Sequence, residues 1–224
     1  MRKPTVDYSD FRLSKLNDPK FSHLKLLVGW IGYFIMYFLT EQLIPLERCV
    51  EVHCFLDDII PFNEYFIIAY VGWYLLIIWS LLYFMFYNVE NFKRLQIFII
   101  VTQIVATVIY IIVPSCQNLR PDVFPRDNFL TDIAKLLYAA DTNTGVCPSL
   151  HCAYSIGIAS VWLKEKESSV YTRIFVVVFC ILVCLSTMFV KQHSAVDFFA
   201  AIPVCIIAEI IACGSWWKKK FKKA

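Results

Sequence analysis

Two side chains near the C-terminus have the types and the spacing of a catalytic pair. His193 precedes Asp197 by four positions, so on a helix both would lie on the same face. A carboxylate placed there can accept the Nδ1 proton of the imidazole, and this leaves Nε2 free to act as a nucleophile. The spacing therefore predicts that His193 and Asp197 work together.

A second set of residues could bind and protonate a phosphate ester. His151 follows Pro148 and Ser149 at the start of an apolar stretch. Proline suits the first turn of a helix, and the free N–H groups of that turn, with the Ser149 hydroxyl, could bind an anion. His151 could then protonate a leaving oxygen. The planar guanidinium of Arg120 suits phosphate oxygens, and Lys191 is a further candidate cation. Together these residues predict a site where a phosphate monoester or diester is attacked in line.

The elements that must position these residues are membrane helices. The 224-residue chain is 59% hydrophobic and 17% charged, and its mean hydropathy is +0.61. Soluble domains carry ~25% charged residues. This composition excludes an ordinary soluble domain, a disordered chain and a nucleic-acid-binding module. The formal net charge of +3 is too small to indicate a polyanionic partner. A lipid bilayer is the expected partner, and no nucleic acid is.

Long apolar runs predict an all-α, polytopic membrane protein with six transmembrane helices. The predicted spans are Leu24–Ile44, Tyr65–Tyr87, Leu95–Val113, Pro148–Leu163, Ile174–Val190 and Ala195–Cys213. They form one catalytic domain over 24–214, between an N-terminal segment, 1–23, and a basic tail, 215–224. The fourth span is short and rich in small residues, so we expect it to pack inside the bundle; a buried or re-entrant helix is the alternative. A short interfacial helix is also expected over 127–140.

The distribution of Lys and Arg predicts the orientation. Sixteen of the 21 fall in the two terminal segments and in the loops after the second and fourth spans. Positive charge marks the cytoplasmic side, so both termini are expected to be cytoplasmic. The loops 45–64, 114–147 and 191–194 then face the extracytoplasmic side, and the active site with them. No cleavable signal peptide is expected, because the first 23 residues are polar and charged.

The nine cysteines do not form a metal-binding pattern. No pair of the nine cysteines has the CxxC spacing of zinc ligands, so we expect no metal and no cofactor. A Cys49–Cys54 disulfide is the nearest candidate among cysteines predicted to lie outside. Glu209, deep in the last span, is interpreted as a structural hydrogen-bonding group or part of a proton path.

At these motifs the chain resembles the type 2 phosphatidic acid phosphatase superfamily. Its three motifs are Lys-x6-Arg-Pro, Pro-Ser-x-His and Ser-Arg-x5-His-x3-Asp. The second is complete here at 148–151. The third is present at 186–197, with Thr187 in place of the Arg. The first survives as its Arg-Pro at 120–121, with Val113 in place of the Lys. The order of the motifs and the six-span layout match as well.

The departures resemble the inositol phosphorylceramide synthase branch of that superfamily. By this resemblance His193 is the nucleophile that forms a phosphohistidine, Asp197 is its partner and His151 is the acid and base. The phosphate-binding residues that it implies are Arg120, Ser149 and Lys191. It implies a hydrolase of the lipid phosphatase type, or a phosphotransferase, which acts on a phospholipid, a sphingolipid or an isoprenoid phosphate.

Three alternatives stay open at the level of sequence. The acceptor can be water, as in a phosphatase, or a lipid hydroxyl, as in a head-group transferase of the inositol phosphorylceramide synthase type. A non-catalytic lipid transporter or scaffold belongs to a different class. A transporter would more naturally show polar residues midway along several spans, or an internal repeat, and neither is visible. The sequence gives no indication of the oligomeric state.

Overall fold

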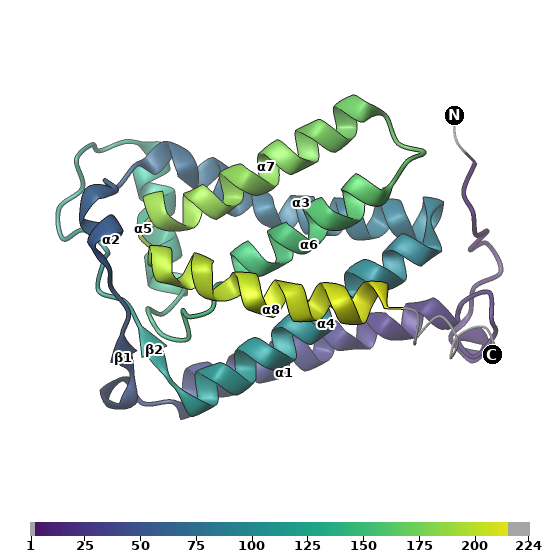
Figure 1. The fold of residues 1–224 in the computed structure, drawn as a ribbon, viewed down its shortest axis with the longest axis horizontal. Helices are drawn as coiled ribbons and strands as arrows, with labels where there is room; N and C mark the ends of the chain where they lie inside the picture. Colours follow the sequence, from purple (N-terminus) through teal and green to yellow (C-terminus); the bar gives the residue numbers. More distant parts are fainter. Residues whose placement is uncertain (1–2, 215–224) are drawn as a thin grey trace.

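The computed structural model describes residues 3–214, and this part of the chain is mostly helical (Figure 1). The long helices are α1 (Val28–Leu43), α3 (Ile67–Tyr87), α4 (Val89–Ile112), α6 (Leu150–Lys164), α7 (Val170–Phe189) and α8 (Ala195–Cys213). Two shorter helices, α2 (Phe55–Ile59) and α5 (Phe129–Ala140), lie in the connections. Four 3-10 turns are Leu13–Lys15, Ser22–Leu27, Leu46–Arg48 and Glu64–Phe66. The basic tail predicted at 215–224 lies outside the described residues.

The six long helices run along one axis and alternate in direction (Figure 1). The helices α2 and α5 lie at one end of the bundle, which we call the α5 end. There, strand β1 (Val50–Glu51) pairs in parallel with strand β2 (Ser115–Cys116) and ties the first long connection to the second. The N-terminal segment and the end of α8 lie together at the opposite end (Figure 1).

Five helical segments are long and apolar enough to cross a membrane. They are Ser22–Thr40, Glu64–Tyr87, Val89–Ile112, Val170–Phe189 and Ala195–Cys213. Helix α6 is shorter: its 15 residues span only ~22 Å at 1.5 Å per residue, less than a ~30 Å hydrocarbon core. The chain is therefore a multi-pass membrane protein by length and composition, with five such helices in the described part.

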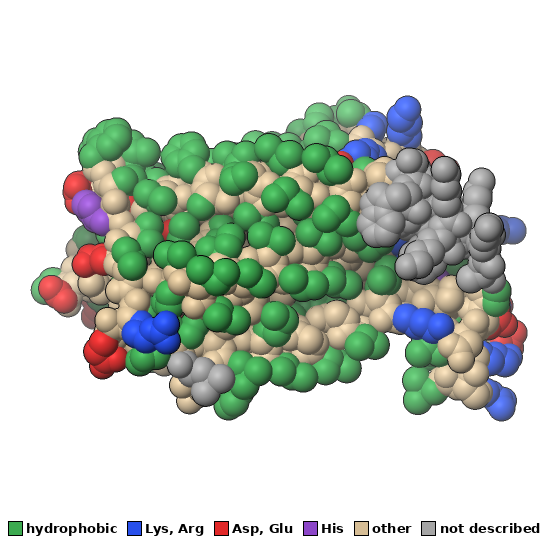
Figure 2. All heavy atoms as spheres, turned by 60° about the horizontal axis from the view of Figure 1, so that its bottom comes forward, with side chains coloured by type: hydrophobic (Ala, Val, Ile, Leu, Met, Phe, Trp, Pro, Cys, Tyr) green, Lys and Arg blue, Asp and Glu red, His purple; other side chains and the backbone are tan. Residues whose placement is uncertain are grey.

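The surface agrees with this assignment. Apolar side chains cover the length of the bundle on the face shown in Figure 2, and charged side chains gather toward its two ends. Phe34, Leu75 and Ile210 are each more than 60% exposed. Large apolar side chains exposed at such density suit a lipid environment rather than water.

The helix boundaries follow from local capping. Helix α8 has the predicted bounds. Helix α4 begins at Val89 instead of Leu95, because the Asn88 side chain accepts a hydrogen bond from the backbone N–H of Asn91. Helix α6 begins at Leu150 instead of Pro148, because Ser149 is its N-cap residue. Polar capping decides where these helices start, and hydropathy alone does not detect it.

Helix α6 lies inside the bundle, as its small residues predicted. Most of its side chains are buried, and it packs against α4, α7 and α8. Gly157 is the closest approach, since a Cβ there would lie 2.4 Å from Cδ1 of Phe98 on α4. At its far end, the indole of Trp162 donates a hydrogen bond to Ser80 Oγ (3.0 Å). The absence of a side chain at 157 thus lets α6 approach α4 closely.

The connection 114–147 contains the predicted helix and is fixed by polar contacts. Asn128 caps α5 by accepting hydrogen bonds from the N–H groups of Leu130 and Thr131. The carboxylate of Glu64, which is fully buried, accepts two hydrogen bonds from Arg126 and one from Asn128. The 3-10 turn that precedes α3 therefore holds the start of α5 in place.

Two other sequence expectations have an outcome in the fold. Cys49 and Cys54 are both free thiols, so the candidate disulfide is not formed. Glu209 pairs with Lys164 and accepts a hydrogen bond from Ser160 Oγ (2.8 Å), next to the end of α6 away from the histidines. These contacts correspond to the first of the two interpretations of Glu209, a structural hydrogen-bonding group.

Candidate active site

His193 and Asp197 meet at the start of α8. Ser194 is the N-cap residue of this helix, and its backbone N–H donates to the carboxylate of Asp197 (3.0 Å). Nδ1 of His193 lies 3.1 Å from Asp197 Oδ2 and 3.0 Å from the carbonyl oxygen of Val146. Both partners are acceptors, so Nδ1 carries the hydrogen and Nε2 is left as the nucleophilic nitrogen. The structure thus brings the predicted pair together in the predicted orientation.

The charge on His193 depends on its carboxylate partner. Burial of the ring lowers the pKa of His193, but the hydrogen bond and the charge of Asp197 outweigh it, and the pKa lies above its ordinary value. Asp197 is fully buried, and its carboxylate accepts from His193 and from the N-terminus of α8. The pair therefore favours the imidazolium form that a phosphohistidine intermediate resembles in charge.

His151 faces the same space from the first turn of α6. Its ring lies against Tyr70 and Trp73 of α3, with ring centroids 4.4 Å and 4.2 Å away. Its centroid is 5.7 Å from that of His193. Its Nε2 atom is buried and has no hydrogen-bond partner among residues 3–214. The aromatic contacts fix the ring, and the unpaired nitrogen is available to a ligand.

Both histidines line one small cavity, which we call the polar pocket. Its volume is about 80 Å³, and Asp141 and Gln192 line it together with aromatic side chains of α1, α3 and α4. None of its described lining residues is Lys or Arg. An anion bound there would therefore contact neutral donors and the histidines directly, and fixed cations only at a distance.

Arg120 lies behind this pocket and does not line it, and its role as a phosphate ligand stays a prediction. Its guanidinium donates to the backbone carbonyls of Tyr138 (3.1 Å), Asp141 (3.0 Å) and Thr142 (2.8 Å). It also donates to Gln192 Oε1 (2.8 Å). These three carbonyls and the amide oxygen engage both terminal nitrogens of the guanidinium, so Arg120 orders the end of α5 and the residues that follow it.

Gln192 is the residue of the site that the sequence interpretation missed. Arg120 holds its carbonyl oxygen, and its Nε2 has no partner in the described part of the chain although it is buried. Gln192 lines the polar pocket, so its amide N–H groups are available to a phosphate oxygen. Its position immediately before His193 is the only signal in the sequence that could have indicated this.

Two further predicted phosphate ligands lie elsewhere. The ammonium group of Lys191 donates to the carbonyl of Asp57 (2.7 Å) and to that of Ile60, at the end of α2. Free carbonyls at a helix C-terminus attract cations, so this position suits lysine. Ser149 is fully buried, and its hydroxyl accepts the N–H of Cys152 as an N-cap. Neither residue lines the polar pocket, and their role in phosphate binding stays a prediction.

Thr187, which stands at the position of the arginine in the resembled motif, lies in the last turn of α7. Its side chain is fully buried and donates to the carbonyl of Cys184 (2.8 Å). Its own carbonyl accepts the N–H groups of Gln192 and His193, both at 3.0 Å. The space there is closed, so position 187 shapes the turn before α8 instead of reaching the pocket.

Helix α2 is hydrogen-bonded to the turn that carries His193, both before this residue, at Lys191, and after it, at Ser194. Asp57, which is 4% exposed, accepts hydrogen bonds from Ser194 Oγ (2.5 Å) and from the N–H of Ala195 (2.8 Å). The carbonyl of Asp57 also accepts from Lys191, as described above. A carboxylate at the N-terminus of α8 is favourable for the helix dipole as well. Asp57 is therefore a positioning residue for His193.

No metal centre accompanies these groups in the part of the chain that the structure describes. Over residues 3–214 no group of three or more His, Cys, Asp or Glu side chains could hold a metal ion. The thiol of Cys147 lies close to Asp197, and burial, with the nearby carboxylate second, raises the pKa of Cys147 to about 12. The raised pKa keeps this thiol protonated near neutral pH, the form that is a poor nucleophile.

Comparison with known proteins adds no relative: no family model, no curated protein and no solved structure matches this chain. The resemblance to the type 2 phosphatidic acid phosphatases thus rests on the motif residues, of which His151 and His193 line one pocket and Asp197 contacts His193.

Proposed function

We propose that this protein is an integral membrane enzyme that transfers the phosphate of a lipid through a phosphohistidine on His193. It would act as a phosphatidic acid phosphatase-type hydrolase or as a phosphotransferase. The observation that carries the proposal is the arrangement of two imidazoles around one pocket. His193 has its Nδ1 held by two acceptors, and His151 presents an unpaired Nε2.

The reaction needs two steps that these side chains can perform. In the first, Nε2 of His193 attacks phosphorus, the bond from phosphorus to the leaving oxygen breaks, and protonated His151 gives its proton to that oxygen. In the second, an acceptor hydroxyl gives its proton to His151 and its oxygen attacks phosphorus. The phosphorus–Nε2 bond then breaks, and His193 is restored. Asp197 stabilises the imidazolium character of His193 in both steps.

The charges around the pocket favour a phosphate diester as the donor. Asp141 lines the pocket, and Arg120 lies behind it, hydrogen-bonded to the lining residues Asp141, Thr142 and Gln192. A monoester carries up to two negative charges and would need compensating cations in direct contact. A diester carries one, which the positive charge that His193 gains as its Nε2 attacks, together with the amide of Gln192, can balance. This supports head-group transfer from a phospholipid over hydrolysis of a lipid monoester.

The proposed placement in the membrane follows from the charge distribution. Helix α6 would complete six passes inside the bundle, with both termini in the cytoplasm. The polar pocket at the α5 end would then face the extracytoplasmic side, as the 16-to-5 distribution of Lys and Arg supports. A membrane-impermeant thiol reagent should label a cysteine placed at Val123 in intact cells. Labelling only after cell lysis would contradict this orientation.

The test of function is turnover by the purified protein with a panel of phospholipids, scored for free phosphate and for new lipid products. We expect a new phosphodiester lipid when a lipid alcohol is supplied. His193→Ala should abolish turnover. The matched control is His53→Ala, which removes an exposed histidine that also pairs with an aspartate, Asp58 (2.9 Å), but lies outside the pocket. Equal turnover in the two variants would contradict the proposal.

A further inference from the structure

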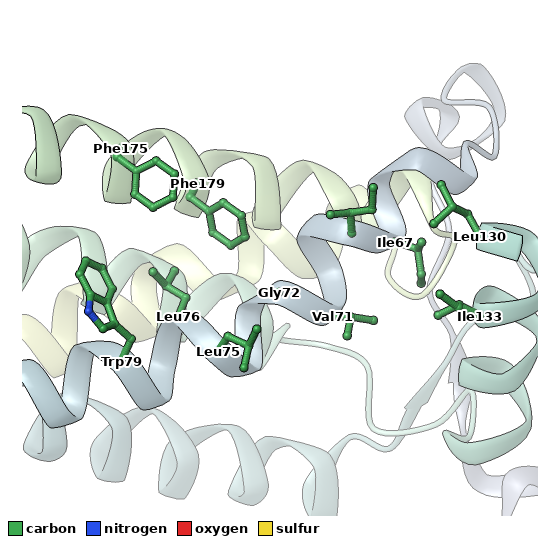
Figure 3. Close-up of a pocket in the computed structure, with 11 residues that line it drawn as sticks. Ile67, Val71, Gly72, Leu75, Leu76, Trp79, Leu130, Ile133, Phe175 and Phe179 are labelled. Atoms are coloured by element: carbon green, nitrogen blue, oxygen red, sulfur yellow. The ribbon is translucent and has the colours of Figure 1, made fainter.

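Two apolar grooves of similar size flank helix α3. The first, which we call the α1–α3 groove, has a volume of about 590 Å³ and is lined by apolar side chains such as Phe34, Ile78 and Leu82. The second, the α3–α7 groove, has a volume of about 560 Å³ and also involves α5. Figure 3 shows this second groove, with Leu75 and Phe179 among the side chains around it. In a bilayer both grooves would contact lipid chains.

Only the first groove is continuous with the polar pocket. Five residues line both cavities, namely Tyr33, Tyr37, Trp73, Asp141 and His151. The described lining of the α3–α7 groove has no residue in common with the polar pocket. The α1–α3 groove therefore begins at the imidazole that would protonate the leaving oxygen.

The chemistry of the α1–α3 groove changes along its length. At the pocket end the hydroxyl of Tyr37 donates to the carboxylate of Asp141 (3.0 Å). The lining farther along α1 and α3 is apolar, as far as Leu27 and Leu82. From Leu27 to Tyr37 is ten residues, or ~15 Å at 1.5 Å per residue. This is half of a ~30 Å hydrocarbon core, the depth of one leaflet.

The groove is also open to the side. Phe34, Ile78 and Leu82 are 63%, 54% and 46% exposed. Helix α1 packs on α4, where a Cβ on Gly29 would lie 2.6 Å from Ile100, and so it leaves the space toward α3 unfilled. A lipid could therefore enter from the bilayer without leaving it.

We propose that the α1–α3 groove binds one hydrocarbon chain of the substrate lipid while its phosphate lies in the polar pocket. This rests on the proposed function and specifies its substrate: a lipid of the leaflet nearest the α5 end, recognised by a chain of leaflet length. The α3–α7 groove holds ordinary bilayer lipid and takes no part in recognition.

Two substitutions on α3 separate the grooves. Ile78→Trp and Leu82→Trp would each place a larger ring in the α1–α3 groove, farther along α3 than Trp73. Both positions are exposed, so the larger ring does not disturb the core. Leu75→Trp is the matched control, because Leu75 lies on the same helix, is also exposed, and lines the other groove. Each variant is assayed with the phospholipid head group turned over fastest, carrying either six-carbon or sixteen-carbon chains.

We expect Ile78→Trp and Leu82→Trp to lower the ratio of kcat/KM for long chains over short chains by about tenfold or more. The ratio is taken within each variant, so a general loss of catalytic activity cancels from it. Leu75→Trp should leave the ratio unchanged. An unchanged ratio in both plug variants, or an equal fall in the control, would overturn the inference.

A binding readout keeps this test separate from the proposed function. Phosphatidylglycerol, a phosphate diester, with a photoreactive group at the end of a sixteen-carbon chain should crosslink to residues of both grooves. Excess six-carbon phosphatidylglycerol should reduce the crosslinks in the α1–α3 groove and leave those in the α3–α7 groove. Crosslinks insensitive to this competitor would show ordinary bilayer lipid in both grooves and overturn the inference. Competition without turnover of any lipid would support the inference and contradict the proposed function.

Discussion

Replacing Asp57 by asparagine tests whether α2 positions the catalytic histidine. The carboxylate accepts three hydrogen bonds, from Ser194 Oγ (2.5 Å), Ala195 N–H (2.8 Å) and Cys54 N–H (2.9 Å). In Asp57→Asn an NH₂ group replaces one oxygen and faces a donor. A hydrogen bond to a charged group contributes ~1.5–3 kcal/mol. With at least one such bond lost, we expect the free energy of unfolding to fall by ~2–3 kcal/mol.

The neighbouring residue provides the control. Asp58 is exposed and pairs with His53, and such surface pairs contribute ~0–1 kcal/mol. Asp58→Asn should therefore change the free energy of unfolding, measured by denaturant titration in detergent, by less than ~1 kcal/mol. Asp57→Asn should also lower kcat/KM by ~100-fold, because a displacement of ~1 Å in a catalytic group can cost that much. Equal effects of the two substitutions would refute the positioning role.

The stabilising effect of Asp57 is also expected to depend on pH. Burial raises the pKa of Asp57, but its hydrogen bonds from Ser194, Ala195 and Cys54 outweigh burial, so the pKa lies below its ordinary value. The ionised carboxylate thus stabilises the folded state above the ordinary pKa of ~4, and this contribution is lost as the pH falls through the folded-state pKa. The stability difference between wild type and Asp57→Asn should be constant near neutrality and shrink below about pH 4.

The remaining predictions concern packing, phosphate binding and titration. Gly157→Ala should destabilise the protein by ~1–3 kcal/mol, because its Cβ would overlap a ring on α4; Gly32→Ala, with open space around it, should not, and thermal unfolding compares them. Gln192→Ala should lower kcat/KM by ~100-fold through loss of a phosphate donor, with the fold intact by circular dichroism. Asp197→Asn should move the acid limb of the kcat/KM profile to lower pH, because it removes the charge that raises the pKa of His193. A limb that does not move would exclude neutral His193 as the attacking group.

Hydropathy predicted most of the fold because the bilayer imposes long apolar helices. The bounds of α8 were predicted to the residue, and the interior place of α6 followed from its small side chains. The starts of α4 and α6 were displaced by caps at Asn88 and Ser149, which are single polar contacts within otherwise periodic sequence. The sequence also predicted six spans, of which α6 is too short to be assigned by length.

The sequence predicted the contact that spacing along one helix determines. It did not predict the contacts that depend on the tertiary structure. A separation of four residues on one helix is enough to bring His193 to Asp197. The partners of Arg120 and Lys191 are backbone carbonyls far away in the chain, which no local pattern reveals. Gln192 gains its place because Arg120 holds its amide oxygen, a contact between residues 72 positions apart.

The central claim is that His193 becomes phosphorylated during turnover. Purified protein should be mixed with a phospholipid labelled in its phosphate, quenched rapidly in alkali to preserve phosphohistidine, and analysed by peptide mass spectrometry. We predict label on the peptide that carries His193, lost in His193→Ala and retained in His53→Ala. Product formation by wild type without label on this peptide, or the same label in His193→Ala, would contradict the claim.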